Sequence, residues 1–310
     1  MRVAVTGATG LIGSAVLRAL RDRGDEPAVL TRNAASARRR LGDVPVHEWA
    51  DPEHSPPPPA ALAGAAAIVH LAGAPVAQRW SVTARRAIRD SRVLGTRSLV
   101  AGIGALPEAE RPRVLLSQSA SGYYGARGDE WLDEDAAPGG DFLARLVVEW
   151  EREAAAARDL GLRVVTVRTG VVLSPRGGAL ERMLPPFRLG IGGPVAGGQQ
   201  YVPWIHLDDV AGALLHCSGT EAAAGPVNLA APGPVTNAEF SRALGAALHR
   251  PAILPVPGLA LRLLYGEMSF IVTTGQRLSS QRLRGWGYSF AHPELPDALR
   301  RVLSRGGGAR

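Results

Sequence analysis

The chain opens with the stretch that decides its fold, Arg2-Val3-Ala4-Val5-Thr6-Gly7-Ala8-Thr9-Gly10-Leu11-Ile12-Gly13. A short apolar run of strand type leads into the pattern T-G-x-x-G-x-x-G, and a helix-forming segment follows up to Arg23. A glycine pattern between a strand and a helix is typical of a dinucleotide-binding unit, in which the free N–H groups and the dipole of the helix face the phosphates. The opening stretch therefore predicts an α/β fold that binds a dinucleotide.

The three glycines have different expected roles. We expect Gly7 to allow the tight turn out of the strand and Gly10 to let a pyrophosphate approach the backbone, while Gly13 lets the helix lie close to the sheet. The run that closes the fourth predicted strand consists mostly of small residues, which let the ribose and the pyrophosphate approach. The predicted cofactor contacts of these two segments are Gly7, Thr9, Gly10, Leu11, Ile12, Gly13, His70, Leu71, Ala72 and Gly73.

Apolar runs of strand type alternate with longer amphipathic segments through the first half of the chain, which predicts a parallel sheet covered by helices. Strands are expected at 2–6, 27–31, 44–48, 66–71, 113–117 and 163–168. Helices are expected at 11–23, 81–104 and 141–159. The predicted fold class is an α/β, Rossmann-type doubly wound parallel sheet.

The composition of the chain changes near Ser174. The segment 174–200 is rich in Gly and Pro, which predicts a loop insertion on the substrate side of a domain that spans 1–232. We expect 233–303 to form a smaller, mostly helical C-terminal domain on that same side. The tail 304–310 is expected to be disordered.

The end of the second predicted strand indicates which dinucleotide fits. An acidic residue there holds a free ribose 2′-hydroxyl, whereas an Arg accommodates a 2′-phosphate. The segment 29–33 contains no acid, and the Thr31 hydroxyl and the Arg32 guanidinium together suit a phosphate. We therefore predict NADP(H) as the cofactor, with the arginines at 38–40 as competing ligands of its 2′-phosphate.

Bulk composition excludes several classes of function. All 35 positions counted as Lys or Arg are Arg, so any mechanism that needs a lysine is excluded. The net charge is +7, but the arginines are spread along the chain without zinc-ligand spacing or an aromatic RNA-binding pattern, which argues against nucleic acid. Cys217 is the only cysteine, so a reducing compartment fits. Because the first strand leaves no room for a signal peptide and no apolar stretch reaches membrane length, we expect a cytoplasmic protein without membrane contact.

Further motifs extend over the whole chain. They are Ser117-Gln118-Ser119-Ala120-Ser121-Gly122-Tyr123-Tyr124-Gly125, Arg168-Thr169-Gly170-Val171-Val172-Leu173, Met183-Leu184-Pro185-Pro186-Phe187-Arg188-Leu189-Gly190, Trp204-Ile205-His206-Leu207-Asp208-Asp209-Val210, Pro255-Val256-Pro257 and Gly266-Glu267-Met268. On these motifs the chain resembles the extended short-chain dehydrogenase/reductase superfamily. Within it, the chain is similar to the NAD(P)-dependent epimerase-like oxidoreductases with a C-terminal domain of unknown function, some of them labelled cell-division inhibitors. The resemblance implies a Rossmann domain followed by a substrate-side domain.

The resemblance also implies a catalytic set of a Ser or Thr, a Tyr with a Lys four residues later, and an Asn on the long helix. Ser119 stands where the Ser is expected. Where the Tyr-x-x-x-Lys pair is expected, Phe142 has no hydroxyl and Leu146 carries no charge. Arg92 stands where the Asn is usual. The usual set is therefore absent at three of its four positions.

Two interpretations remain open. In one, Tyr123 or Tyr124 is the acid/base, Ser119 orients a carbonyl group, and Arg92 supplies positive charge to the site and contacts the cofactor. In the other, the chain binds NADP(H) without turnover and acts as a redox sensor or regulatory module. The substrate of an enzyme would be a small carbonyl or sugar-like molecule, and the arginines at 176, 182 and 188 favour an anionic one. A homodimer is left open.

Overall fold

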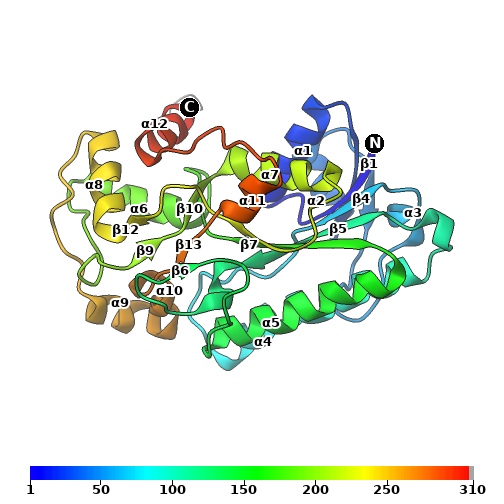
Figure 1. Ribbon diagram of the computed structural model, residues 1–310, viewed down its shortest axis with the longest axis horizontal. Coiled ribbons are helices and arrows are strands. Elements are labelled where there is room, and N and C mark those ends of the chain that lie inside the picture. The colour runs from blue at the N-terminus through cyan, green and yellow to red at the C-terminus, as the bar shows by residue number, and fades with distance from the viewer. Residues whose placement is uncertain (307–310) are drawn as a thin grey trace.

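The computed structural model describes residues 1–306, and a parallel β-sheet lies at its centre (Figure 1). Within the described chain this sheet has seven strands in the order β11-β7-β5-β4-β1-β2-β3, and each neighbouring pair is parallel. The bounds are β1 Arg2–Thr6, β2 Glu26–Thr31, β3 Val46–Glu48, β4 Ala67–His70, β5 Val114–Ala120, β7 Arg163–Thr169 and β11 Gly225–Leu229. The predicted Rossmann-type sheet is confirmed.

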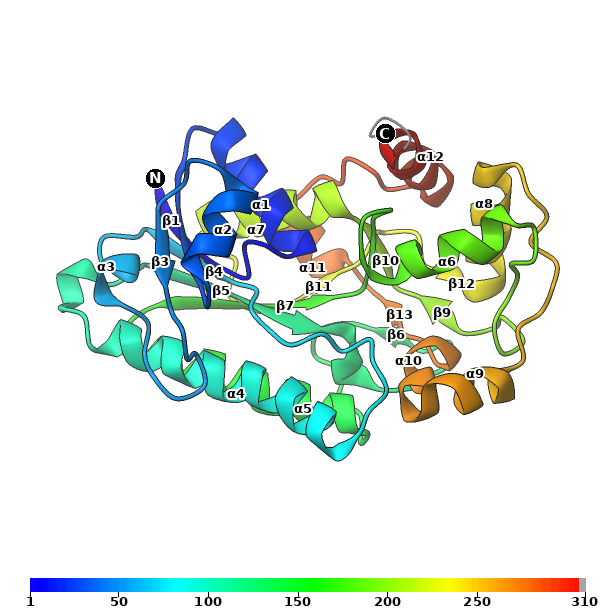
Figure 2. The same ribbon diagram turned by 180° about the vertical axis from the view of Figure 1, so that it is seen from behind.

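Helices cover both faces of the sheet, as the two opposite views show (Figures 1 and 2). Helices α1 (Leu11–Asp22) and α7 (Leu207–Gly219) pack together over one face, and α4 (Val82–Gly104) and α5 (Phe142–Ala155) pack together over the other. Alternate residues of the strands enter the two apolar cores, which explains the nearly continuous apolar runs of the sequence. None of the described helices is long and apolar enough to cross a membrane.

A smaller group of elements lies beyond one end of the sheet (Figure 1). Helices α6 (Gly178–Arg188), α8 (Asn237–Leu248) and α12 (Leu295–Gly306) share an apolar core of their own. The other elements are α2 Ala34–Leu41, α3 Pro59–Leu62, β6 Trp131–Leu132, β8 Val171–Leu173, β9 Tyr201–Val202, β10 Trp204–His206, β12 Val235–Thr236, α9 Gly258–Tyr265, α10 Phe270–Thr273, β13 Arg277–Leu278 and α11 Gln281–Gly285. Four short 3₁₀ turns in the described chain are Glu108–Glu110, Ser121–Tyr124, Ala156–Leu160 and Gly266–Ser269.

Several details differ from the sequence expectations, among them helices α2 and α7, which were not predicted. The predicted loop insertion 174–200 contains α6, whose buried face is formed by Leu180, Leu184 and Phe187. The strand β11 was not predicted and extends the sheet beyond β7. Helix α12 continues through Gly306, so the tail does not become irregular at residue 304, and 307–310 lie outside the described residues. The domain boundary at residue 232 stays a prediction. Helix α6, which precedes this residue, packs with α8 and α12, which follow it.

Candidate active site

The order of the strands places a crevice at the ends of β1 and β4. The sheet grows outward in opposite directions from this pair, and in doubly wound sheets the ligand lies where the strand order reverses. Gly7 follows β1 with a φ of +68°, and a Cβ there would lie 2.7 Å from the backbone carbon of Leu71. A Cβ on Gly13 would lie 2.3 Å from the Gly7 carbonyl oxygen. The loop therefore needs glycine at both positions to hold its shape.

The N-terminus of α1 leaves backbone donors available to an anion. Its N-cap is Gly10, which offers no side chain to accept from them, and its first turn contains no acidic residue. The first-turn N–H groups and the positive end of the helix dipole thus face a cavity of about 400 Å³. The lining residues are Gly7, Gly10, Leu11, Ile12, Gly13, Leu71, Gln118, Gly170, Val171, Val172, Gly178 and Ala179. This cavity, the cofactor cavity, fits a pyrophosphate.

His70 is a buried, hydrogen-bonded residue and is not among those that line this cavity. Its ring is buried, with Nδ1 2.8 Å from Thr6 Oγ1 and Nε2 3.0 Å from Thr96 Oγ1. Because Thr6 Oγ1 already accepts from the N–H groups of Leu71 and Ala72, its own hydrogen is directed at Nδ1. Nε2 then carries the ring proton. The ring therefore has a structural role, and the predicted cofactor contact of His70 stays a prediction.

Two arginines stand near the expected adenosine end of the cofactor. Arg32 follows β2 and is exposed, next to the half-buried Thr31. Arg40, in α2, donates from Nη2 to the carbonyl oxygen of Thr9 at 3.1 Å. This bond brings a second guanidinium to the glycine loop itself, so Arg40 is the competitor among the arginines at 38–40 that the structure favours.

A second cavity of about 370 Å³ adjoins the first, and we call it the substrate cavity. The two cavities share Ile12, Gln118, Gly170, Val171 and Val172 as lining residues. Ser119, Ser121, Asp141, Trp150 and Arg92 line the substrate cavity, and Phe270, Ile271, Thr274 and Gln276 contribute a wall from the C-terminal part. The arginines at 176, 182 and 188, on which the prediction of an anionic substrate was based, are not among the lining residues of either cavity.

The wall formed by α5 shows where the usual Tyr and Lys would point. Leu143 and Val147 line the substrate cavity at the Tyr-x-x-x-Lys spacing. Leu146, of the expected pair Phe142 and Leu146, lines this cavity too, whereas Phe142 packs edge-on against Trp80 with ring centroids 5.3 Å apart. In either register the wall presents no hydroxyl and no amine.

A carboxylate stands behind the serine of the substrate cavity. Ser119 donates from Oγ to Glu151 Oε1 at 2.5 Å. Arg168 holds both oxygens of this carboxylate, with Nε and Nη2 each 2.9 Å from one of them. Burial by itself would lower the pKa of the Arg168 guanidinium, but its hydrogen bonds to Glu151 raise it overall. Arg168 therefore holds the Glu151 carboxylate in a fixed orientation, in contact with the Ser119 hydroxyl.

The two tyrosines pack around Arg168 and line neither cavity in the described chain. The ring centre of Tyr123 lies 3.4 Å from the Arg168 guanidinium carbon. Tyr124 is fully buried, donates to Asn228 Oδ1 at 2.7 Å and accepts from Arg168 at 3.0 Å. Burial raises the pKa of Tyr124 to about 12, although Arg168 opposes this. Both rings thus pack against the network, and a catalytic role of either tyrosine stays a prediction.

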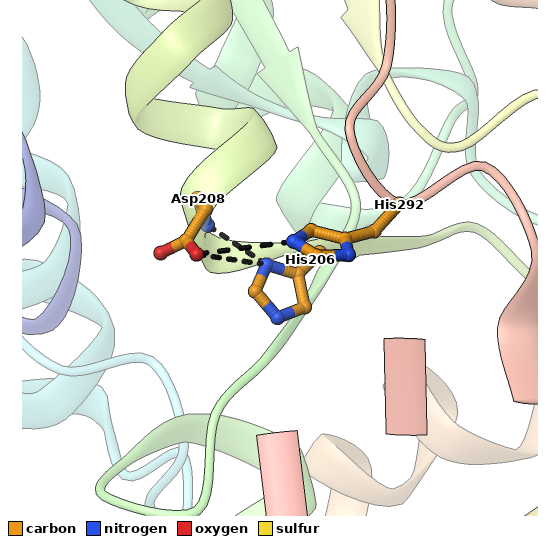
Figure 3. A group of neighbouring side chains, drawn as sticks. All are labelled: His206, Asp208 and His292. Atoms are coloured by element: carbon orange, nitrogen blue, oxygen red, sulfur yellow. Dashed lines mark hydrogen bonds and ion pairs between the residues drawn. The ribbon is translucent and has the colours of Figure 1, made fainter. Parts of the chain in front are cut away.

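A separate polar cluster joins α7 to the segment before α12 (Figure 3). The rings of His206 and His292 lie 3.9 Å apart between centroids, and the Asp208 carboxylate is 3.8 Å from each ring. Their ligand atoms lie within 4.8 Å of one another, a spacing that metal sites share. However, His206 Nδ1 accepts from the Asp208 N–H at 3.0 Å and so caps α7. The cluster therefore links the start of α7 to the segment before α12.

A glycine loop at the switch point of a parallel sheet, next to a serine-lined cavity, is the architecture of an extended short-chain dehydrogenase/reductase. The chain belongs to the NAD dependent epimerase/dehydratase family, which it matches over residues 3–230. Residues 256–302 match a domain of unknown function, DUF1731. The resemblance expected from the motifs is confirmed.

Relatives with this organisation span the length of the chain. Epimerase family protein Mb2239 of Mycobacterium bovis is 40% identical over 307 residues, 98% of each chain. The crystal structure of human epimerase family protein SDR39U1 with NADPH matches with a TM-score of 0.87 and 34% identity, over 98% of this chain and 99% of that one. The nucleoside-diphosphate sugar epimerase of Corynebacterium glutamicum matches with a TM-score of 0.76 and 31% identity, over 98% of this chain and 58% of that one.

Proposed function

We propose that this protein is an NADP(H)-dependent oxidoreductase of the epimerase type that acts on a small carbonyl or hydroxyl compound. The observation that carries the proposal is the Ser119–Glu151 pair in the wall of a cavity that adjoins the cofactor cavity. A module that only binds a dinucleotide has no need for a second cavity with a serine and a carboxylate in contact. The NADPH found in the human relative and the sugar epimerase relative support the same assignment.

The cofactor would be held mostly by backbone. The glycine loop and the α1 N-terminus would receive the pyrophosphate, and Arg32 and Arg40 would receive the 2′-phosphate. When bound, the nicotinamide would supply hydride transfer between its ring and a carbinol or carbonyl carbon of the substrate. The residues lining the neighbouring cavity must therefore move only a proton.

Ser119 and Glu151 take over the proton step that the usual Tyr and Lys perform. During oxidation of an alcohol, Ser119 Oγ receives the substrate hydroxyl proton while its own proton passes to Glu151 Oε1 along their 2.5 Å hydrogen bond. Carbonyl reduction runs the same path in reverse. Arg168 keeps the carboxylate oriented, and Tyr123 and Tyr124 keep Arg168 in place.

Transfer of an isotope from the labelled cofactor to a carbonyl compound tests this proposal. Protein with deuterium-labelled NADPH is offered a panel of 2-oxo acids, dicarbonyls and keto sugars, and the products are analysed by mass spectrometry. We expect deuterium in at least one product, and a loss of about 100-fold or more in Ser119→Ala. Ser121→Ala, a serine in the same cavity wall, is the matched control and should keep its rate.

The absence of the Tyr–Lys pair favours the competing interpretation, a catalytically silent NADP(H)-binding sensor. It predicts tight NADPH binding with no isotope transfer to any compound of the panel. That result would contradict the oxidoreductase proposal. A sensor would also change hydrogen exchange in the segment 176–200 between its NADPH and NADP⁺ forms.

A further inference from the structure

One arginine of α4 differs from all the others on this helix. Arg85 pairs with Glu267, Arg86 with Asp90, Arg89 with Glu149 and Arg97 with Glu153. Arg92 has no carboxylate within ion-pair distance in the part of the chain that the structure describes. It is also the α4 arginine that lines the substrate cavity.

Contacts on three sides hold the Arg92 guanidinium in place. Nη1 donates to the carbonyl oxygens of Ala74 at 3.0 Å and Ile88 at 3.1 Å. The guanidinium carbon lies 5.2 Å from the centre of the Trp150 ring, which lines the same cavity. On another side stands Gly73, where an added Cβ would lie 3.1 Å from that carbon. The residue at position 73 must therefore be small to leave room for the Arg92 guanidinium.

The charge of Arg92 persists although its surroundings oppose it. Burial lowers the pKa of Arg92 to about 10, which still leaves the group protonated at neutral pH. Taking a cation out of water is unfavourable unless an anion or enough acceptors replace the water. Two backbone carbonyls engage one of its nitrogens, and the planar fork has further donors. Asp141 also lines the cavity, but its Oδ1 caps α5 through the N–H groups of Leu143 and Ala144.

We propose that Arg92 is the anchor of an anion subsite in the substrate cavity, and that the substrate carries a carboxylate or phosphate group close to its reacting carbon. The proposal rests on the proposed function, because it assigns the substrate class of the same cavity. The cofactor's own phosphates are the other source of such an anion. Arg92 lines the substrate cavity and not the cavity of the glycine loop, which favours the substrate.

Binding measured without turnover tests this inference separately from catalysis. Protein saturated with NADPH is titrated by calorimetry with oxamate, with its neutral analogue oxamide, and with inorganic phosphate. We expect at least one of the two anions to bind and oxamide to bind about 10-fold more weakly than oxamate or not at all. Preference for oxamate identifies a carboxylate, and preference for inorganic phosphate identifies a phosphate.

Substitutions then assign the anion to its anchor. Arg92→Met should weaken binding of the preferred anion about 10- to 100-fold, and Arg92→Lys should retain part of it. Arg97→Gln, which removes an exposed arginine of the same helix, is the matched control and should leave the affinity unchanged. NADPH affinity should hold in all three variants.

Three results would overturn the inference. They are the absence of saturable binding of either anion, equal binding of oxamate and oxamide with no binding of phosphate, and unchanged anion affinity in Arg92→Met. A loss of NADPH affinity in Arg92→Met would assign the arginine to the cofactor instead. A protein that binds the anion but transfers no deuterium would contradict the proposed function and leave the subsite standing.

Discussion

The cofactor loop and the proton network stand at neighbouring strand ends but are built in opposite ways. The loop uses backbone groups of the consecutive residues 7–13. The network uses side chains from β5, α5 and β7, with Ser119, Glu151 and Arg168 brought together only by folding. The consecutive loop keeps its function through the shape of its backbone. The network consists of side chains from separate elements, so its residues can change while the cavity keeps its shape.

His70 connects the loop after β4 with the wall of the substrate cavity. Through Thr6 it holds the loop after β4, and through Thr96 it reaches Trp150 in the wall of the substrate cavity. A change at His70 should therefore act on the stability of the fold, whereas a change within the loop or the network should act on the function of that region.

The largest expected effect is on the cofactor loop. Gly13→Ala places a Cβ 2.3 Å from the Gly7 carbonyl oxygen, so the loop backbone must move away from the phosphate-binding shape. We expect NADPH affinity to fall by about 100-fold or more, as measured by fluorescence titration. The matched control is Gly219→Ala, because a Cβ at Gly219 meets nothing within 4 Å. Equal NADPH affinity in both variants would contradict the geometry of the loop.

A smaller effect is expected from the pH dependence of stability. Burial lowers the pKa of His70 to about 4, below the ordinary value of 6.5. Between these two pH values His70 binds a proton in the unfolded chain but not in the folded chain. The free energy of unfolding therefore falls as the pH drops from 6.5 toward 4. His70 should account for a loss of about 2 kcal/mol between pH 7 and pH 5.

Urea unfolding at the two pH values measures this term. His70→Asn should be less stable at pH 7 and should lose less stability than the wild type on acidification. His249→Asn alters a histidine at the C-terminus of α8 and should keep the full pH dependence. If His70→Asn loses as much stability on acidification as the wild type, the buried His70 ring is not the cause of the pH dependence.

The smallest expected effect concerns cofactor choice. Arg32→Ala and Arg40→Ala should each reduce the preference for NADPH over NADH by about 10-fold, because each removes a charged hydrogen-bond donor to the 2′-phosphate. NADH affinity should change little. Arg39→Ala, on the same helix as Arg40, is the control. Preference that is unchanged in both Arg32→Ala and Arg40→Ala would place the 2′-phosphate elsewhere.

The sequence allowed prediction of the parts that depend on local pattern. The strand–glycine–helix order predicted β1, the loop and α1, and the apolar runs predicted six of the seven sheet strands of the described chain. Helix α6 was missed because Gly and Pro suggested a loop, although Leu180, Leu184 and Phe187 lie at helical spacing. The strand β11 was missed because Gly225 and Pro226 obscure a short apolar run.

The proton network could not be predicted, since no local pattern joins its members. Glu151 stands on α5, eight positions beyond Leu143, and is one of many acids on amphipathic helices. Arg168 is one arginine in an arginine-rich chain, and only its burial reveals a role. Tyr123 and Tyr124 carry the phenol groups that the usual mechanism needs, but the fold places both rings against Arg168.

The most direct test of the central claim is the rate of hydride transfer in a single turnover of Glu151→Gln. Gln keeps the shape of the side chain but cannot take the Ser119 proton as a carboxylate does. We expect transfer to slow by about 100-fold or more, at a temperature at which the variant is folded, while NADPH affinity stays near that of the wild type. The melting temperature should fall, because Arg168 loses the charge of its buried partner. Tyr123→Phe, which keeps the ring over Arg168, should transfer at the wild-type rate. Wild-type transfer in Glu151→Gln, together with a loss in Tyr123→Phe, would contradict the account and return the proton step to the tyrosine.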